Sequence, residues 1–188
     1  VAEYCLSTIL FSLKLGWRHL RNVRKTREWK WEDSVPGGYG SSVGLVSLGE
    51  IGHKTLELLK PFDLQIQDFS TSLSEEGARE LGVRRVALDE LFRTSDVVSL
   101  HTPDLPATRG MIDRDLLSSM KKDATLINSA RGAVVDQDAL VEVLQERPDL
   151  TALLDVTVPD PLNPDSPLYD LDNAFLTPHI AGSMYSET

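Results

Sequence analysis

The stretch VGLVSLGEIG, residues 43–52, decides the fold of this chain. An apolar run suited to a buried strand enters a turn that contains Gly49 and Gly52, and a helical pattern follows. The dinucleotide fingerprint G-x-G-x-x-G has this form, although Ser47 stands where its first glycine belongs. In that motif the later glycines admit a pyrophosphate and pack the helix on the strand, and the start of the helix offers N–H groups to the anion. The stretch therefore indicates either a variant nucleotide site or an ordinary strand–turn–helix connection.

From residue 43 onward the chain alternates short apolar runs with helical patterns. The predicted strands are 44–46, 64–67, 97–100, 125–128, 152–156 and 174–176. The predicted helices are 51–59, 74–81, 88–92, 114–120 and 137–145, and the proline-rich segment 159–168 is predicted to be loop. Strand–helix–strand units at this spacing predict an α/β fold, a doubly wound parallel sheet of the Rossmann type with right-handed crossovers.

The segment before this alternation predicts an N-terminal helical arm over residues 1–33. Residues 2–15 are apolar nearly all round, which predicts a helix covered by a core or by a second subunit. Gly16 interrupts the pattern, and a more polar helical stretch follows to about Trp31. The Pro/Gly/Ser-rich residues 34–42 are predicted to link this arm to a dinucleotide-binding domain over 43–188.

Composition narrows the class of protein. The 188 residues, 41% of them hydrophobic, can form one domain, and no apolar run is long enough to span a bilayer. Net charge is -10, but residues 1–31 carry seven Lys and Arg against two Asp and Glu. We interpret that basic stretch as a solvated helix face, because the acidic remainder would repel a nucleic acid. A single cysteine, Cys5, is expected in the core and fits a cytoplasmic protein, and we predict no metal site, no membrane contact and no nucleic-acid partner.

Asp68 follows the second predicted strand, nineteen residues after Gly49. A carboxylate at this position accepts hydrogen bonds from the adenosine ribose and repels a 2′-phosphate. The sequence therefore predicts NAD (NADH) as the cofactor and makes NADP less favoured.

Three later stretches carry a resemblance: HTPDLPATRGMI (101–112), LLSSMKKDATLINSARGAVVDQDAL (116–140), and LLDVTVPDPL (153–162) with LTPHIAGS (176–183). Together they resemble the D-isomer-specific 2-hydroxyacid dehydrogenases, over essentially all of Ala2 to Ser183. The resemblance implies NAD-dependent interconversion of a D-2-hydroxy acid and its 2-keto acid. It also implies that this chain is the cofactor domain alone, without the substrate domain, that the isolated domain turns over poorly, and that the 2–15 helix forms a homodimer contact.

The expected catalytic residues are Arg131, Asp160 and His179. Arg131 comes at the carboxyl end of a buried strand, where its guanidinium would bind the carboxylate of a keto acid. His179 would act as general acid/base. Relatives usually have a glutamate in the slot that Asp160 occupies, so Asp160 is the expected partner of His179, with one methylene less reach. Asp155 resembles the residue that binds the nicotinamide carboxamide.

The resemblance and the fingerprint together predict a set of cofactor contacts that follows the ends of the strands. The set is Ser47, Gly49, Glu50, Ile51, Gly52, Asp68, His101, Thr102, Pro103, Thr108, Asn128, Ser129, Ala130, Arg131, Asp155, His179 and Gly182.

Two alternatives share this architecture. One is a non-catalytic, NAD(H)-sensing module of the corepressor type. The other is a formate-dehydrogenase-like activity, which the carboxylate at Asp160 disfavours because such relatives pair the histidine with glutamine. Glyoxylate, hydroxypyruvate, lactate-type acids and phosphoglycerate all remain open as substrates.

Overall fold

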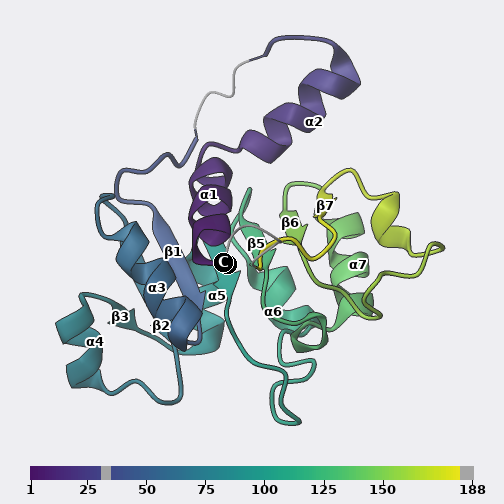
Figure 1. Cartoon of the computed structure of the whole chain (residues 1–188). Coiled ribbons are helices and arrows are strands. Elements are labelled where there is room, and N and C mark those ends of the chain that lie inside the picture. The colour runs from purple at the N-terminus through teal and green to yellow at the C-terminus, as the bar shows by residue number, and fades with distance from the viewer. Residues whose placement is uncertain (31–34, 183–188) are drawn as a thin grey trace.

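A computed structural model describes residues 1–30 and 35–182. Within them, seven parallel strands form one sheet in the order β3-β2-β1-β4-β5-β6-β7 (Figure 1). The strands are β1 (Ser42–Val46), β2 (Gln65–Phe69), β3 (Arg84–Arg85), β4 (Val97–Leu100), β5 (Thr125–Asn128), β6 (Thr151–Leu154) and β7 (Ala174–Leu176). The order reverses at β1, which has β2 on one side and β4 on the other. The predicted doubly wound parallel sheet is confirmed, and this reversal opens a crevice at the carboxyl ends of β1 and β4.

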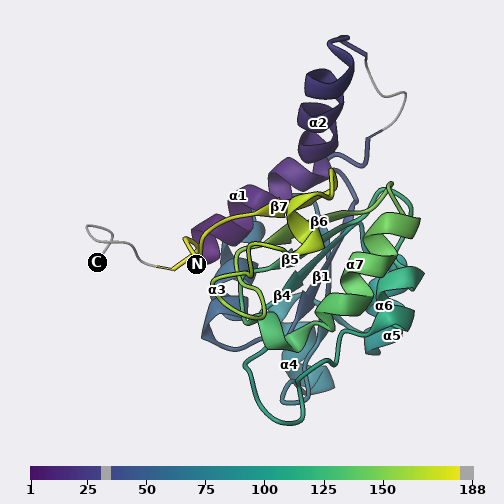
Figure 2. The same cartoon turned by 90° about the vertical axis from the view of Figure 1, so that its right-hand side faces the viewer.

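Helices cover both faces of the sheet (Figure 2). They are α1 (Ala2–Leu13), α2 (Gly16–Thr26), α3 (Glu50–Leu59), α4 (Glu75–Leu81), α5 (Leu88–Thr94), α6 (Arg114–Ser119) and α7 (Gln137–Glu146). Side chains alternate across each strand, so β4 sends Val97 to the core under α1 and α3, and Val98 to the core under α5, α6 and α7. The strands β4, β5 and β6 are buried on both faces, which explains their largely apolar sequences.

The helix α1 belongs to the core of its own chain. Cys5, Ile9 and Leu13 are fully or almost fully buried and pack with residues of α3 and the sheet. The prediction of a buried Cys5 is confirmed. Because this face of α1 is occupied internally, only its outer side, including the partly exposed Phe11, is left for any contact with a second subunit.

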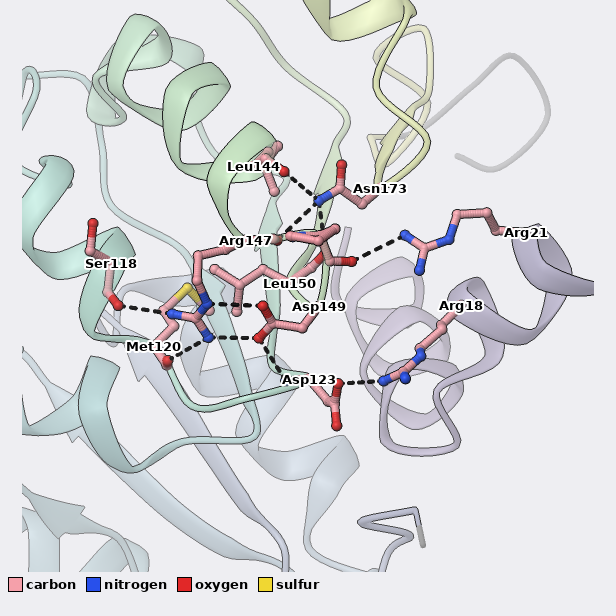
Figure 3. Close-up of polar contacts among 11 residues, drawn as sticks. Arg18, Arg21, Ser118, Met120, Asp123, Leu144, Arg147, Asp149, Leu150 and Asn173 are labelled. Carbon is pink, nitrogen blue, oxygen red and sulfur yellow. Dashed lines mark hydrogen bonds and ion pairs between the residues drawn. The ribbon is translucent and has the colours of Figure 1, made fainter. Parts of the chain in front are cut away.

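The helix α2 projects from the opposite end of the molecule from the glycine turn (Figure 2). Its arginines contact the loops that precede the strands: Arg18 is paired with Asp123, and Arg21 donates to the carbonyl of Pro148 at 3.4 Å (Figure 3). Beside these contacts, the side-chain amide of Asn173 donates to three carbonyl oxygens at the end of α7 and in the loop after it. The amino ends of β5, β6 and β7 are thus tied together, away from the carboxyl edge.

Some predicted boundaries were wrong. The polar helix was expected to reach about Trp31, but α2 ends at Thr26, because Arg27 adopts a left-handed φ of 57° and its N–H bonds back to Val23. Trp31 itself lies outside the described residues. The second strand runs to Phe69, two residues further than predicted, and the two-residue strand β3 was not expected. The sixth strand ends at Leu154, before Asp155 and not at Val156, and the proline-rich loop ends in a 3-10 turn, Pro167–Tyr169. No helix in the described ranges is long and apolar enough to cross a membrane.

Candidate dinucleotide and acid–base site

The turn between β1 and α3 has the geometry of a diphosphate cradle. Ser47 adopts a φ of 79°, in the left-handed region that favours glycine, and its N–H donates to the carbonyl of Phe69 at 2.8 Å. A Cβ on Gly52 would lie 2.5 Å from the carbonyl oxygen of Ser47, so helix and turn pack too closely for any side chain there. By contrast, a Cβ on Gly49 would meet no atom within 4 Å.

The space in front of Gly49 adjoins the start of α3, where no side chain caps the helix. The first N–H groups of a helix have no partner within the helix and attract an anion. The residues present therefore fit a diphosphate. Glu50 opens the helix with an exposed carboxylate beside this position, and Ile51 is partly exposed next to it.

Two cavities flank the end of β4 and share Thr102 and Pro103. The smaller, about 150 Å³, lies between the ends of β1, β2 and β4 and is lined by Val46, Ser47, Phe69, Ser70, Thr71, Thr102, Pro103, Leu105, Thr108 and Met111. The larger, about 460 Å³, extends toward β5 and is lined by Val1, Ile51, His101, Thr102, Pro103, Asp104, Ser129, Ala130 and Arg131. A cofactor with two halves would occupy both cavities across the crevice at the strand reversal.

Asp68 lies elsewhere than the sequence predicted. It is inside β2, in register with Leu45 of β1 and Arg85 of β3, and its side chain is completely buried. Neither of its carboxylate oxygens has a hydrogen-bond partner, and it lines neither cavity. Burial raises the pKa of Asp68 to about 6, against the weaker opposite effect of Arg85. The expectation that Asp68 closes the strand and faces the cofactor ribose is not met by this position.

His101 lines the larger cavity and carries a buried ring nitrogen without a hydrogen-bond partner. Its Nε2 atom is shielded and has no hydrogen-bond partner, and burial lowers the pKa of His101 to about 4, so the ring is neutral near pH 7. Thr108 closes the adjacent loop, because its hydroxyl donates to the carbonyl of Pro103 at 2.6 Å and accepts from the N–H of Leu105.

The turn after β5 places Arg131 at the carboxyl edge. The side chain of Asn128 is used within the turn: it accepts from the N–H of Ala130 and donates to the carbonyl of Arg131. The hydroxyl of Ser129 points inward to the sulfur of Cys5, 3.1 Å away. Asn128 and Ser129 therefore shape the turn, and only the exposed guanidinium of Arg131, which donates to the carbonyl of Ala130 at 2.6 Å, is available at the surface.

Gly132 explains why this turn is compact. A Cβ at this position would lie 2.2 Å from the carbonyl oxygen of Thr157, in the loop after β6. The loops after β5 and β6 are thus in direct backbone contact, and the arginine is held next to the segment that leads to Asp160.

His179 and Asp160 are in contact, as the sequence predicted. Nδ1 of His179 lies 2.7 Å from Oδ2 of Asp160, and the two side chains are 52% and 40% exposed. An ionised aspartate can only accept, so Nδ1 carries the proton in this contact and Nε2 faces away from Asp160. Aspartate therefore has enough reach to orient the imidazole.

Asp155 anchors the segment that carries His179. Its Oδ1 accepts from the N–H of Ile180 and its Oδ2 accepts from the N–H of Ala181, both at 2.8 Å, while the hydroxyl of Thr177 also donates to Oδ1. Asp155 is buried, and its carboxylate is used within the protein, whereas the resemblance had implied a contact with nicotinamide. Gly182 follows this anchored segment with open space around its α-carbon.

The structure brings the predicted residues to one edge of the sheet but divides them between cavities. Arg131 lines the larger of the two cavities described above, whereas Asp160 lines another of about 450 Å³, with Asp155, Thr157, Tyr169 and Thr177. Neither of these two cavities is lined by both Arg131 and His179.

Sequence reasoning missed the residues that line the smaller cavity beyond the fingerprint. Ser70 and Thr71 directly follow β2, and Leu105 and Met111 belong to the loop after β4. Ser70 was not predicted because the strand was expected to end at residue 67. With β2 ending at Phe69, Ser70 is the first residue of the turn. Leu105 and Met111 gave no signal of their own.

The fold, the glycine turn and the cavities at the strand reversal define a Rossmann-type dinucleotide-binding domain. Residues 8–181 match the NAD binding domain of the D-isomer specific 2-hydroxyacid dehydrogenases, and the chain belongs to that family.

Curated relatives agree with this assignment. The chain is 35% identical to the D-3-phosphoglycerate dehydrogenase of Archaeoglobus fulgidus over 163 residues, 85% of this chain and 31% of the relative. It is 39% identical to the glyoxylate reductase of Korarchaeum cryptofilum over 189 residues, 98% of this chain and 57% of the relative. The chain thus spans 31% of the length of the first relative and 57% of the length of the second.

A solved structure shows the same arrangement. The D-isomer specific 2-hydroxyacid dehydrogenase from Lactobacillus delbrueckii ssp. bulgaricus, in its NAD complexed form, superposes with a TM-score of 0.84 at 27% identity. The match covers 100% of this chain and 60% of that one.

Proposed function

We propose that this chain is the cofactor-binding part of an oxidoreductase that interconverts a D-2-hydroxy acid and its 2-keto acid. The observation that carries the proposal is the hydrogen-bonded pair of His179 and Asp160, which follow the carboxyl ends of β7 and β6 as the glycine turn follows that of β1. A module that only senses NAD(H) needs the turn but has no use for an oriented imidazole. The family assignment and the relatives' names support the same reaction class.

The residues would divide the work as follows. The glycine turn, Ser47 to Gly52, would hold the reduced dinucleotide, whose chemistry when bound would be the supply of a hydride to the carbonyl carbon of the substrate. Arg131 binds the carboxylate of the keto acid, and Nε2 of His179, protonated for this step, donates a proton to the carbonyl oxygen. Asp160 holds Nδ1 and stabilises the protonated ring before the transfer, and Asp155 holds the backbone of the segment. Enclosure of the substrate would come from parts of the relatives that this chain does not span.

Binding is tested first on this chain, by titrating NADH and following the fluorescence of the reduced nicotinamide. We expect saturable binding that is lost when Gly49, where an added side chain meets no atom of the protein within 4 Å of its Cβ, is replaced by valine. The reaction is tested on the complete gene product with a panel of 2-keto acids, from glyoxylate and hydroxypyruvate to phosphorylated acids, with NADH and NADPH. Absence of dinucleotide binding would refute the proposal, and binding without turnover of any keto acid would favour the sensing module.

The preference for NADH over NADPH that the sequence predicts depends on Asp68 facing the ribose. Because Asp68 is buried inside β2, we propose that the cofactor is a nicotinamide dinucleotide of either kind.

We also propose a homodimer, supported by apolar side chains left exposed on the N-terminal helices and just after α2. Leu20 is 50% exposed and Trp29 86% exposed, and Phe11 is open on the outer side of α1. Exposed apolar groups of this size gather where a partner covers them. Sedimentation velocity should show a dimer that Leu20→Glu dissociates and that Lys60→Glu, directly after α3, leaves intact. A monomer at every concentration would exclude the dimer.

A further inference from the structure

The turn that follows β2 has the position from which a Rossmann fold reads the adenosine ribose. Ser70 and Thr71 line the smaller cavity together with Ser47, and the main chain of Phe69 is bonded to the N–H of Ser47. The hydroxyls of Ser70 and Ser72 are 3.1 Å apart and hydrogen-bonded. In this fold the residue that reads the ribose 2′ position stands at the carboxyl end of the second strand, beside the glycine turn.

No charged side chain lines this cavity. Asp68 is separated from it by lying within β2, between β1 and β3, with its carboxylate fully buried. Arg85, in register with Asp68, is paired with Glu75 of α4 at 3.0 Å. The position that usually distinguishes the two dinucleotides therefore carries hydroxyl groups in place of a carboxylate or an arginine.

We propose that the hydroxyl turn Ser70–Ser72 is the ribose-recognition element of this chain and that it accepts NADPH as well as NADH. The inference depends on the dinucleotide site proposed above. Preference for NADH comes from repulsion between a carboxylate and the 2′-phosphate, and preference for NADPH comes from an arginine that binds it. A serine hydroxyl donates to a ribose hydroxyl or to a phosphate oxygen, so neither dinucleotide is rejected.

The test is calorimetric titration of the chain with NADH and with NADPH, which needs no catalytic turnover. We expect the two dissociation constants to agree within about tenfold, because a neutral hydroxyl neither repels the 2′-phosphate of NADPH nor forms an ion pair with it. Ser70→Asp should weaken NADPH binding by about 50-fold or more and leave NADH binding within about threefold, because two like charges would then be in contact. Thr71→Asp, at an exposed position, provides the same change where Ser70→Asp does not fold.

Asp68→Asn is the matched control, since it removes the carboxylate that the sequence had suggested as the discriminator. We expect it to leave the ratio of the two dissociation constants unchanged. Dissociation constants that differ by more than about tenfold in either direction, or a changed ratio in Asp68→Asn, would overturn the inference and leave the proposed function intact. Failure of both dinucleotides to bind would overturn the proposed function itself.

Discussion

Nδ1 of His179 lies 2.7 Å from Oδ2 of Asp160, although nineteen positions separate the two residues in the chain. The contact joins the loop after β6 to the segment after β7, and Asp155 fixes that segment by accepting two backbone N–H bonds. The pair is oriented by the fold of this chain and is exposed at its carboxyl edge.

His179→Ala should remove the general acid and lower kcat of the complete gene product by about 10²–10⁴-fold. The NADH dissociation constant should stay within about threefold, since the imidazole in this role acts on the substrate and not on the dinucleotide. Steady-state kinetics and fluorescence titration measure the two effects. His19→Ala, on α2, is the control. Unchanged turnover in His179→Ala would exclude this residue as the acid.

Ser47→Gly should stabilise the chain. The left-handed backbone of Ser47 destabilises the folded chain by about 1–2 kcal/mol. Replacement by glycine removes this strain, but the greater freedom of glycine in the unfolded chain offsets about 0.5–1 kcal/mol of the gain. We expect a net gain of about 0.5–1 kcal/mol in the free energy of unfolding, measured by urea denaturation. Ser47→Val should destabilise. A loss of stability in Ser47→Gly would mean that the serine side chain makes a contact that offsets the strain.

Gly49→Ala and Gly52→Ala should separate binding from folding. At Gly49 an added methyl meets nothing in the protein, so stability should change by less than about 0.5 kcal/mol while NADH affinity falls about tenfold or more. At Gly52 the methyl meets a backbone oxygen at 2.5 Å, and we expect a loss of about 1–3 kcal/mol in the free energy of unfolding. Equal loss of stability in both variants would contradict the open space seen at Gly49.

Asp68→Asn should stabilise the chain in a pH-dependent way. Its pKa is about 6 in the folded chain and near the ordinary 3.8 when unfolded, so the folded state binds more protons between these values. Wild-type stability should therefore fall as pH rises from about 4 to about 6 and stay lower above that. At pH 7 the variant should gain up to about 2–3 kcal/mol, and at pH 3 it should gain little.

Urea denaturation at the two pH values measures this difference, and Asp63→Asn, at an exposed loop position, is the control. A gain of the same size at pH 3 and pH 7 would show that titration of Asp68 is not its cause.

The sheet could be predicted because its central strands are buried on both faces and appear as continuous apolar runs. The end of β2 could not, since Gln65, Gln67 and Asp68 give this strand a polar sequence. Asp68 is unusual in being buried as a carboxylate without a partner, and local patterns favour placing such a residue in a turn. The strand β3 consists of two arginines and carries no strand signal at all.

Within the site, the pairing of His179 with Asp160 was predictable from the motif, and the role of Asp155 was not. Asp155 holds this segment because the backbone N–H groups of residues 180 and 181 lie close to the end of β6. The pattern of side chains in the sequence does not predict this proximity. Similarly, the contact of Gly132 with the carbonyl of Thr157 joins two loops that the sequence keeps far apart. Backbone-to-backbone proximity is the information that sequence reading lacked.

The three hydrogen bonds that Asp155 accepts have a practical meaning for spectroscopy. His179 lies in a segment that hydrogen bonds within this chain hold in place, so its imidazole should display one set of resonances before any substrate is bound. Titrating those resonances in this chain alone would give the proton affinity of the acid directly, free from the conformational closure that complicates kinetic profiles of whole enzymes.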